Sequence, residues 1–348
     1  MKLVVVAMVC AASVYGAETE ESLQRSVAVS SGTHLRLNAD FGSVSLKPAA
    51  GHSVDVNVLF RGDPPSRREF DRMMHDFSLK LNQQGTEVSV EAVFIHGWEP
   101  VLSFLIDGGL FSGHSMCREW RCLTYSRWLD EVEIRVAVPA QFNTYLNTSG
   151  GSIAVSEMKG EVTAHTSGGW LRFDHVEGRV NGTTSGGGID LRGVSGKSSV
   201  HTSGGWIRMS EMSGDVEAST SGGWISIDTA SGRIKAHTSG GWIDAKAISG
   251  PIDVSTSGGG VNAALVAQPR EDCRFSTSGG GITVTLPGDA KVDLDASTSG
   301  GSVTTDFPVP RNGEHDYTTL RTSLNGGGPL VYMHTSGGGI HLKKSGGI

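Results

Sequence analysis

The chain from residue 148 onward repeats one short pattern of small, polar and apolar residues. Each copy begins with Thr-Ser-Gly-Gly and continues with two runs in which apolar residues occupy alternate positions. The first seven copies share one spacing, the next two steps are three positions longer, and the last step is close to two periods. Such a fixed period is the signature of a stacked repeat architecture. The copies start at Thr148, Thr166, Thr184, Thr202, Thr220, Thr238, Thr256, Thr277, Thr298 and Thr335.

Alternation with a period of two predicts β-strands that bury one face. An 18-residue unit with two short strands cannot bury its apolar face alone, so each copy is predicted to form one coil of a parallel β-solenoid. The fold class is therefore mainly β, with two strands in each 18-residue coil. We expect the repeated Thr to face inward with stacked hydroxyls bonded to one another. We also expect the corner glycines to adopt positive φ.

A different pattern precedes the repeats, over residues 17–135, and is expected to form a β-rich cap on the first coil. Ser66 and Glu69 have the spacing of a capping box, and apolar residues follow at helical spacing, which predicts one helix over 66–78. The predicted domains are thus a cap over 17–135 and a solenoid over 136–348. Residues 98–129 form an insertion, either folded over the first coil or presented to a partner or membrane. The apolar helix positions are Phe70, Met73, Met74 and Phe77, and strands are predicted around 35–58, 79–81 and 87–93.

Residues 1–16 have the features of a cleaved export signal. Lys2 supplies the positive start, an apolar stretch follows, and small residues precede a cleavage point before Ala17. Export would place the chain in the periplasm, on the cell surface or in the medium, where disulfides persist. Cys117 and Cys122 are close enough to bridge a small loop. Cys273 is expected to pack as a small residue on a strand.

Composition excludes several classes of protein. With a net charge of −7 and a pI of 5.9, the chain lacks the basic excess of a nucleic-acid-binding protein. No apolar run reaches the length of about 18 residues that a membrane span requires, so no transmembrane segment is expected after signal cleavage. No Asp recurs in register as a calcium-binding β-roll would need, and the histidines recur only at every second coil. We therefore expect no metal and no cofactor.

The entry into and exit from the repeats resemble a known family. The stretch from Asn147 to Val155, the corner glycines such as Gly160 and Gly178, and the closing Leu324–Leu330 segment are similar to those of the DUF4097 family, known as "putative adhesin". The resemblance covers about residues 130–348. It implies an exported bacterial β-solenoid with an adhesin-like role, and it implies no activity.

The candidate site is a row of aromatic side chains on the outside of the coils. The position before each repeated inward Ile is predicted to point outward, and three consecutive coils carry Trp there. Two positions further on, charged residues flank this row. The row could be a binding platform for an envelope glycan or another surface protein, or a stack that only stiffens the sheet. The candidate ligand-binding residues are Trp170, Trp206, Trp224, Trp242, Arg172 and Arg208.

An enzyme acting on polysaccharide is the alternative, since β-helices host lyases and hydrolases. Glycoside cleavage needs two carboxyl groups about 5–10 Å apart. The predicted outward carboxylates, such as Asp190 and Asp244, are scattered over different coils. The sequence therefore favours a non-enzymatic binding or structural protein, and the resemblance to the DUF4097 family implies an adhesin-like role in the bacterial cell envelope.

Overall fold

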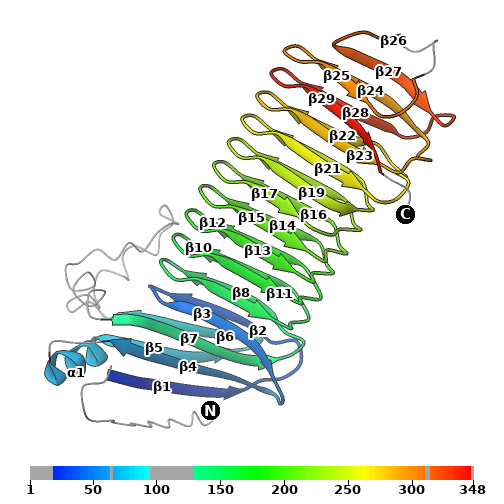
Figure 1. Ribbon diagram of the computed structural model, residues 1–348. Helices are drawn as coiled ribbons and strands as arrows, with labels where there is room; N and C mark the ends of the chain where they lie inside the picture. Colours follow the sequence, from blue (N-terminus) through cyan, green and yellow to red (C-terminus); the bar gives the residue numbers. More distant parts are fainter. Residues whose placement is uncertain (1–18, 63–65, 95–128, 310–313, 346–348) are drawn as a thin grey trace, which may run out of the picture. The chain divides into compact units, whose positions relative to one another are not determined.

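The computed structural model describes residues 19–62, 66–94, 129–309 and 314–345 (Figure 1). The predicted export signal, the pair Cys117 and Cys122 and nearly all of the 98–129 insertion lie outside the described residues. The chain forms two compact units, Met1–Trp170 and Leu171–Ile348. The predicted division at residue 135 stays a prediction.

The first unit contains two sheets and one helix. One sheet has the strand order β1-β4-β7-β3-β9, and the other has the order β10-β8-β2-β6-β5. Strand β1 was not among the predicted elements. The elements are β1 (Thr19–Ala28), β2 (His34–Ala39), β3 (Ser43–Ala49), β4 (Ser53–Gly62), α1 (Arg67–Asp76), β5 (Phe77–Gln84), β6 (Glu87–Phe94), β7 (Leu129–Pro139), β8 (Asn143–Thr148), β9 (Ile153–Ser156) and β10 (Val162–Thr166).

Helix α1 confirms the predicted start but ends earlier than predicted. The Ser66 side chain accepts a hydrogen bond from the Glu69 N–H, as a capping box requires, and Phe70 and Met73 are buried. Phe77 was expected to close the apolar face of the helix. It instead opens strand β5, where it packs edge-on against Phe60 with ring centroids 4.8 Å apart. Pairing of β5 with β6 competes successfully with one further helical turn.

Strands from the segment before the repeats belong to the same sheets as the first repeat strands. β2 pairs in parallel with β8, and β3 pairs in parallel with β9. Ala39 lies opposite Thr148, and Val44 lies opposite Ile153, so the buried positions continue in register. Residues 34–49 therefore form a coil that the Thr-Ser-Gly-Gly motif does not reveal.

The second unit confirms the predicted coils. Its first sheet contains, in spatial order, β11 (Leu171–Asp174), β13 (Ile189–Arg192), β15 (Ile207–Ser210), β17 (Ile225–Ile227), β19 (Ile243–Ile248), β21 (Val261–Leu265), β23 (Ile282–Leu286), β29 (Ile340–Lys344) and β25 (Val303–Thr305). Its second sheet contains β12 (Val180–Thr184), β14 (Ser198–Thr202), β16 (Val216–Thr220), β18 (Ile234–Thr238), β20 (Ile252–Thr256), β22 (Cys273–Thr277), β28 (Leu330–Thr335), β24 (Val292–Thr298), β27 (Thr319–Leu324) and β26 (Glu314–His315).

Parallel pairing aligns equivalent residues of successive coils. Ile207 lies opposite Ile225, and Thr202 lies opposite Thr220, each one 18-residue period away. The apolar residues of both sheets face a common interior and are almost completely buried. Cys273 is among them, as predicted, and burial raises the pKa of its thiol. The fold class predicted from the sequence is confirmed.

The repeated threonines face inward as expected, but they do not bond one another. The Thr220 hydroxyl donates to the Gly205 carbonyl at 2.8 Å and accepts from the Gly223 N–H at 3.3 Å. Each hydroxyl thus links the corner of its own coil to the corner of a neighbouring coil. The same donation is made by Thr166, Thr202, Thr238, Thr256, Thr277, Thr298 and Thr335 to glycine carbonyls at 2.6–2.7 Å.

The reason for the corner glycines also differs from the prediction. Positive φ is found at Gly160 and Gly178 but not at the glycines of the Thr-Ser-Gly-Gly corners. The second of these glycines is required by close approach: a Cβ on Gly205 would lie 1.9 Å from the Gly187 carbonyl oxygen. Left-handed backbone occurs instead at a different bend, where Glu211 has a φ of 57°. The corners are therefore points of backbone contact between coils.

Replacing Thr220 by the isosteric valine is expected to lower the free energy of unfolding by about 1–3 kcal/mol, because two half-buried backbone groups lose their partner. Thr183, exposed on the outer face of β12, gives a matched control, and Thr183→Val should change stability by about 0.5 kcal/mol or less. Urea denaturation followed by circular dichroism measures both. Equal effects would contradict a stabilising role for the inward hydroxyl.

The C-terminal coils do not stack in chain order. β28 lies between β22 and β24, and β29 lies between β23 and β25, so the last coil of the chain is inserted between two earlier ones (Figure 1). Strand β29 has a parallel partner on each side over Ile340–Leu342, whereas Lys343 and Lys344 pair only with β23. The antiparallel strand β27 covers the outer edge of β24.

Candidate functional site

Three of the candidate tryptophans form a continuous stack on the outer face of the first sheet. Trp206, Trp224 and Trp242 each follow a Gly-Gly corner and precede an inward Ile, which directs their side chains outward. The rings of Trp206 and Trp224 are 5.4 Å apart at 9°, and those of Trp224 and Trp242 are 5.1 Å apart at 1°. The predicted stacking, one coil apart, is confirmed. We call these three residues the tryptophan ladder.

The stack leaves few ring faces open. Both faces of Trp224 are covered by its neighbours. Trp206 lies over Gly188, where an added Cβ would come within 2.5 Å of its ring. On its outer side Trp242 meets no aromatic ring of the described residues, and it is 45% exposed. The ladder therefore does not present three open indole faces to solvent. Trp206 and Trp224 expose mainly their ring edges, and Trp242 exposes one ring face.

The candidate arginines have different surroundings. The Arg208 guanidinium lies 5.4 Å from the centre of the Trp206 ring and 5.6 Å from that of Trp224, a cation–π geometry. Arg172 lies on β11, one coil before Gly188. Its guanidinium is 3.4 Å from a carboxylate oxygen of Asp190. Trp170 ends the first unit and is 46% exposed. Arg208 thus reinforces the ladder, whereas Arg172 pairs with a carboxylate one coil away.

A shallow hollow of about 280 Å³ opens beside the free face of Trp242. Gly260 and Gly281, at the tryptophan position of the next two coils, form its floor. On one side the Asn262 amide donates to Asp244 at 2.7 Å. The Lys246 ammonium lies 3.3 Å from the other oxygen of Asp244. Asn262 and Lys246 were not predicted, although Asn262 could have been found by extending the outward column of Arg208 and Asp244 by one coil.

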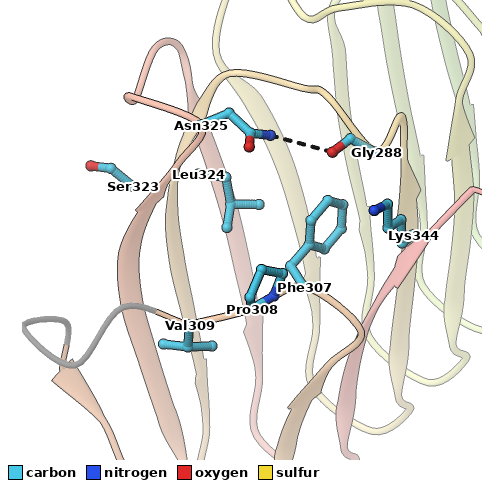
Figure 2. A pocket seen from close by; sticks show the side chains of 8 residues that line it. All are labelled: Gly288, Phe307, Pro308, Val309, Ser323, Leu324, Asn325 and Lys344. Atoms are coloured by element: carbon cyan, nitrogen blue, oxygen red, sulfur yellow. Dashed lines mark hydrogen bonds between the residues drawn. The ribbon is translucent and has the colours of Figure 1, made fainter.

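A second hollow, of about 380 Å³, lies at the C-terminal end of the second unit (Figure 2). Phe307 and Leu324 point into it, and Lys344 stands at its side. The Asn325 amide donates to the carbonyls of Gly288 at 3.3 Å and Ala290 at 2.9 Å. These bonds tie the turn after β27 to the loop before β24, so this hollow belongs to the closure of the C-terminal coils.

Two of the described carboxylates, Glu133 and Asp306, are stabilised in their charged form by hydrogen bonds. Glu133, hydrogen-bonded by Arg135, and Asp306, hydrogen-bonded by His341, both have a lowered pKa. A catalytic acid needs the opposite shift. Among the residues that the structure describes, no cluster of three or more His, Cys, Asp or Glu side chains could hold a metal ion.

The comparison with protein families identifies the architecture. The family model described as Toastrack DUF4097 matches residues 130–343. The chain belongs to this family. The match covers more than half of the chain and confirms the resemblance carried by the repeat motif. Among curated proteins, none matches this chain.

Several solved structures match most of the chain at low identity. A "putative adhesin" from Bacteroides fragilis is 10% identical, with 93% of this chain and 97% of that chain covered and a TM-score of 0.32. A "putative lipid binding protein" from Parabacteroides distasonis is 11% identical, with the same coverage and a TM-score of 0.37. A "putative adhesin" from Parabacteroides merdae is 9% identical, covers 95% of this chain and 97% of its own, and has a TM-score of 0.36.

The geometry of the ladder predicts a graded loss of stability. Trp224→Ala removes two stacked ring pairs, and since each pair contributes about 0.5–1.5 kcal/mol, the unfolding free energy should fall by about 1–3 kcal/mol. Trp242→Ala removes only one pair and should cost about half as much. Urea denaturation of both variants tests this order. An equal or larger loss for Trp242→Ala would show that ring stacking does not determine their contribution.

Proposed function

We propose that the chain is a non-enzymatic, exported binding or structural protein of the bacterial cell envelope, with an adhesin-like role. The outer face of its first sheet would meet an envelope glycan or another surface protein. The observation that carries the proposal is the tryptophan ladder, a rigid aromatic stack on the outside of the coils that ends in an open indole face.

An open indole face beside polar side chains is typical of a surface that binds a ligand without catalysing a reaction on it. Large aromatic side chains contribute most of the energy at many interfaces, and indole combines an apolar face with a polar N–H. The ladder holds Trp242 in place through stacking, so little side-chain entropy is lost on binding. Family membership agrees with such a role, although the family name carries no ligand.

The enzymatic alternative has less support. The carboxylates nearest the ladder are already engaged: Asp190 with Arg172, and Asp244 with both Lys246 and Asn262. Carboxylates held in such pairs are poorly placed to act as the acid and the base or nucleophile of glycoside cleavage. Export rests on the N-terminal sequence pattern. In the described part of the chain, the only membrane finding is that no helix has the length and apolar character of a span.

Cosedimentation with purified bacterial envelope polysaccharide tests the proposal. The chain without residues 1–16 is expected to sediment with the polysaccharide, saturably, and to release neither reducing ends nor unsaturated sugars. Release of products would favour the enzyme. Failure to sediment with any envelope polysaccharide or with purified surface protein would contradict the binding role.

A further inference from the structure

We propose that the outer face of Trp242 and the glycine floor beside it form a binding site for a single neutral pyranose ring of a polysaccharide. This inference rests on the proposed function and narrows it from the whole ladder to one end. The residues involved are Trp242, Gly260, Gly281, Asp244 and Asn262.

The first argument is that the two ends of the ladder differ. Gly188 lies beneath Trp206 and closes one end of the stack, because that ring fills the space where a side chain would stand. At the other end the tryptophan position is occupied by Gly260 and then Gly281, and Trp242 keeps an open face. Since each coil advances by about 4.8 Å, close to the spacing of the stacked indoles, a six-membered ring lying parallel to Trp242 fits where the next indole would stand.

The second argument is the chemistry of that open face. The face of an indole carries partial negative charge, and the C–H groups on one face of a pyranose ring carry partial positive charge, so the two rings attract when stacked. The hollow of about 280 Å³ lies near the lower limit of about 300 Å³ for small-molecule sites, which suits one ring rather than a long chain buried lengthwise.

The third argument is the polar edge. Asn262 uses one amide N–H on Asp244, which leaves its carbonyl oxygen and second N–H for sugar hydroxyls. Lys246 is not among the lining residues: its ammonium lies 3.3 Å from the other Asp244 oxygen and 3.7 Å from Asp228, and it holds the Asp244 carboxylate in place. Asp244 is the one charged side chain among the residues that line the hollow, so the carboxylate of an acidic sugar would meet like charge there.

The occupant is therefore a neutral hexose or N-acetylhexosamine unit. Titration of the chain without residues 1–16 with cellohexaose, chitohexaose and mannohexaose should give saturable binding to at least one, with a dissociation constant in the millimolar range or below. The Trp242 indole N–H signal, assigned by Trp242→Phe in NMR spectra, should shift on binding. Hexagalacturonate, which is acidic, should bind at least tenfold more weakly.

Two variants test the site in opposite ways. Trp242→Ala removes the stacking face, and Gly260→Trp keeps that face but fills the hollow with a further indole. Each variant should weaken binding at least tenfold. Tyr317→Ala removes an exposed aromatic side chain outside the ladder and is the control, with unchanged affinity expected. Circular dichroism and thermal unfolding verify that each variant is folded, and Trp242→Ala carries the test if Gly260→Trp does not fold.

Three results would overturn the inference. They are full affinity in folded Gly260→Trp, no binding of any neutral hexasaccharide up to about 10 mM, and self-association that Gly260→Trp abolishes, which would make a second copy the occupant. Polysaccharide cosedimentation that survives Trp242→Ala would leave the proposed function standing while the pyranose site falls. Hexasaccharide binding at Trp242 without cosedimentation with envelope polysaccharide would support the pyranose site and contradict the envelope role.

Discussion

Gly205→Ala is expected to destabilise the second unit by about 3 kcal/mol or more, although it adds a single methyl group. The added Cβ would lie 1.9 Å from the Gly187 carbonyl oxygen and 2.3 Å from its carbon, so the backbone of one coil must move away from the next. That movement also strains the hydrogen bond from Thr220 to the Gly205 carbonyl and the bond from the Gly205 N–H to Thr202.

The neighbouring glycine of the same corner provides the control. A Cβ on Gly204 would have no atom closer than 3.6 Å, and its φ lies outside the left-handed region, so Gly204→Ala should be neutral or stabilising by about 0.4–1 kcal/mol. Urea denaturation followed by circular dichroism compares the two. Similar unfolding midpoints for both variants would mean that the corners tolerate displacement and that close approach is not why glycine recurs there.

The coils could be predicted from the sequence because each structural repeat corresponds to one sequence repeat. A fixed 18-residue period places Ile207 on Ile225 and Thr202 on Thr220 in any parallel stack, so the period alone defines the register and the buried face. The same reasoning missed residues 34–49, which join the sheets without carrying the motif. Strand pairing there depends on burial and backbone partners, which no repeat marks.

Contacts within the corners could not be predicted in the same way. Recurrence shows that a small residue is needed at Gly205, but not whether the cause is positive φ or a carbonyl 1.9 Å from its absent Cβ. Recurrence likewise shows that Thr220 is inward, but not that a glycine carbonyl is nearer to its hydroxyl than the next threonine is. Both questions depend on how far one coil is shifted over another, which is a property of the folded stack.

The sequence predicted which tryptophans form the candidate site, but it did not predict which ring face stays open. Equal spacing implied that the tryptophans stack, and they do. The direction in which the rings lean decides that Trp206 covers Gly188 and that Trp242 remains 45% exposed, and this direction is a rotamer choice made by the packed sheet. The hydrogen bond from Asn262 to Asp244 beside it likewise depends on side-chain geometry in the folded sheet.

The order of the last coils was hidden for a related reason. Thr277 and Thr298 both lie opposite Thr335, so every coil presents the same residues to its neighbours. Insertion of the final coil between the two earlier ones therefore preserves register. Chain order would have placed β24 directly on β22, and the long step from Thr298 to Thr335 reads equally well as two further turns.

Removal of residues 330–348 is expected to disorder more of the chain than the deleted segment itself. In an ordinary solenoid, loss of the last coil exposes one interface and leaves the rest intact. Here the deletion takes away β28 and β29 from between two coils. Among the described strands, β25 then has no partner, and β24 keeps only the antiparallel β27. The further partner of β27 is the two-residue strand β26, so this small antiparallel sheet is of marginal stability. Amide hydrogen exchange should show residues 292–305 losing protection by at least about a hundredfold.

A truncation after Ser345, which leaves β29 whole, is the matched control and should keep that protection. Retained protection of residues 292–305 in the larger deletion would contradict the expectation and would have one structural meaning: β24 and β25 move inward and pair with β22 and β23. The step from Thr277 to Thr298 permits that register, because it equals the step from Thr256 to Thr277. The native order would then be a preference set by the final coil, which competes for the same two edges and gains a partner on both sides by occupying them.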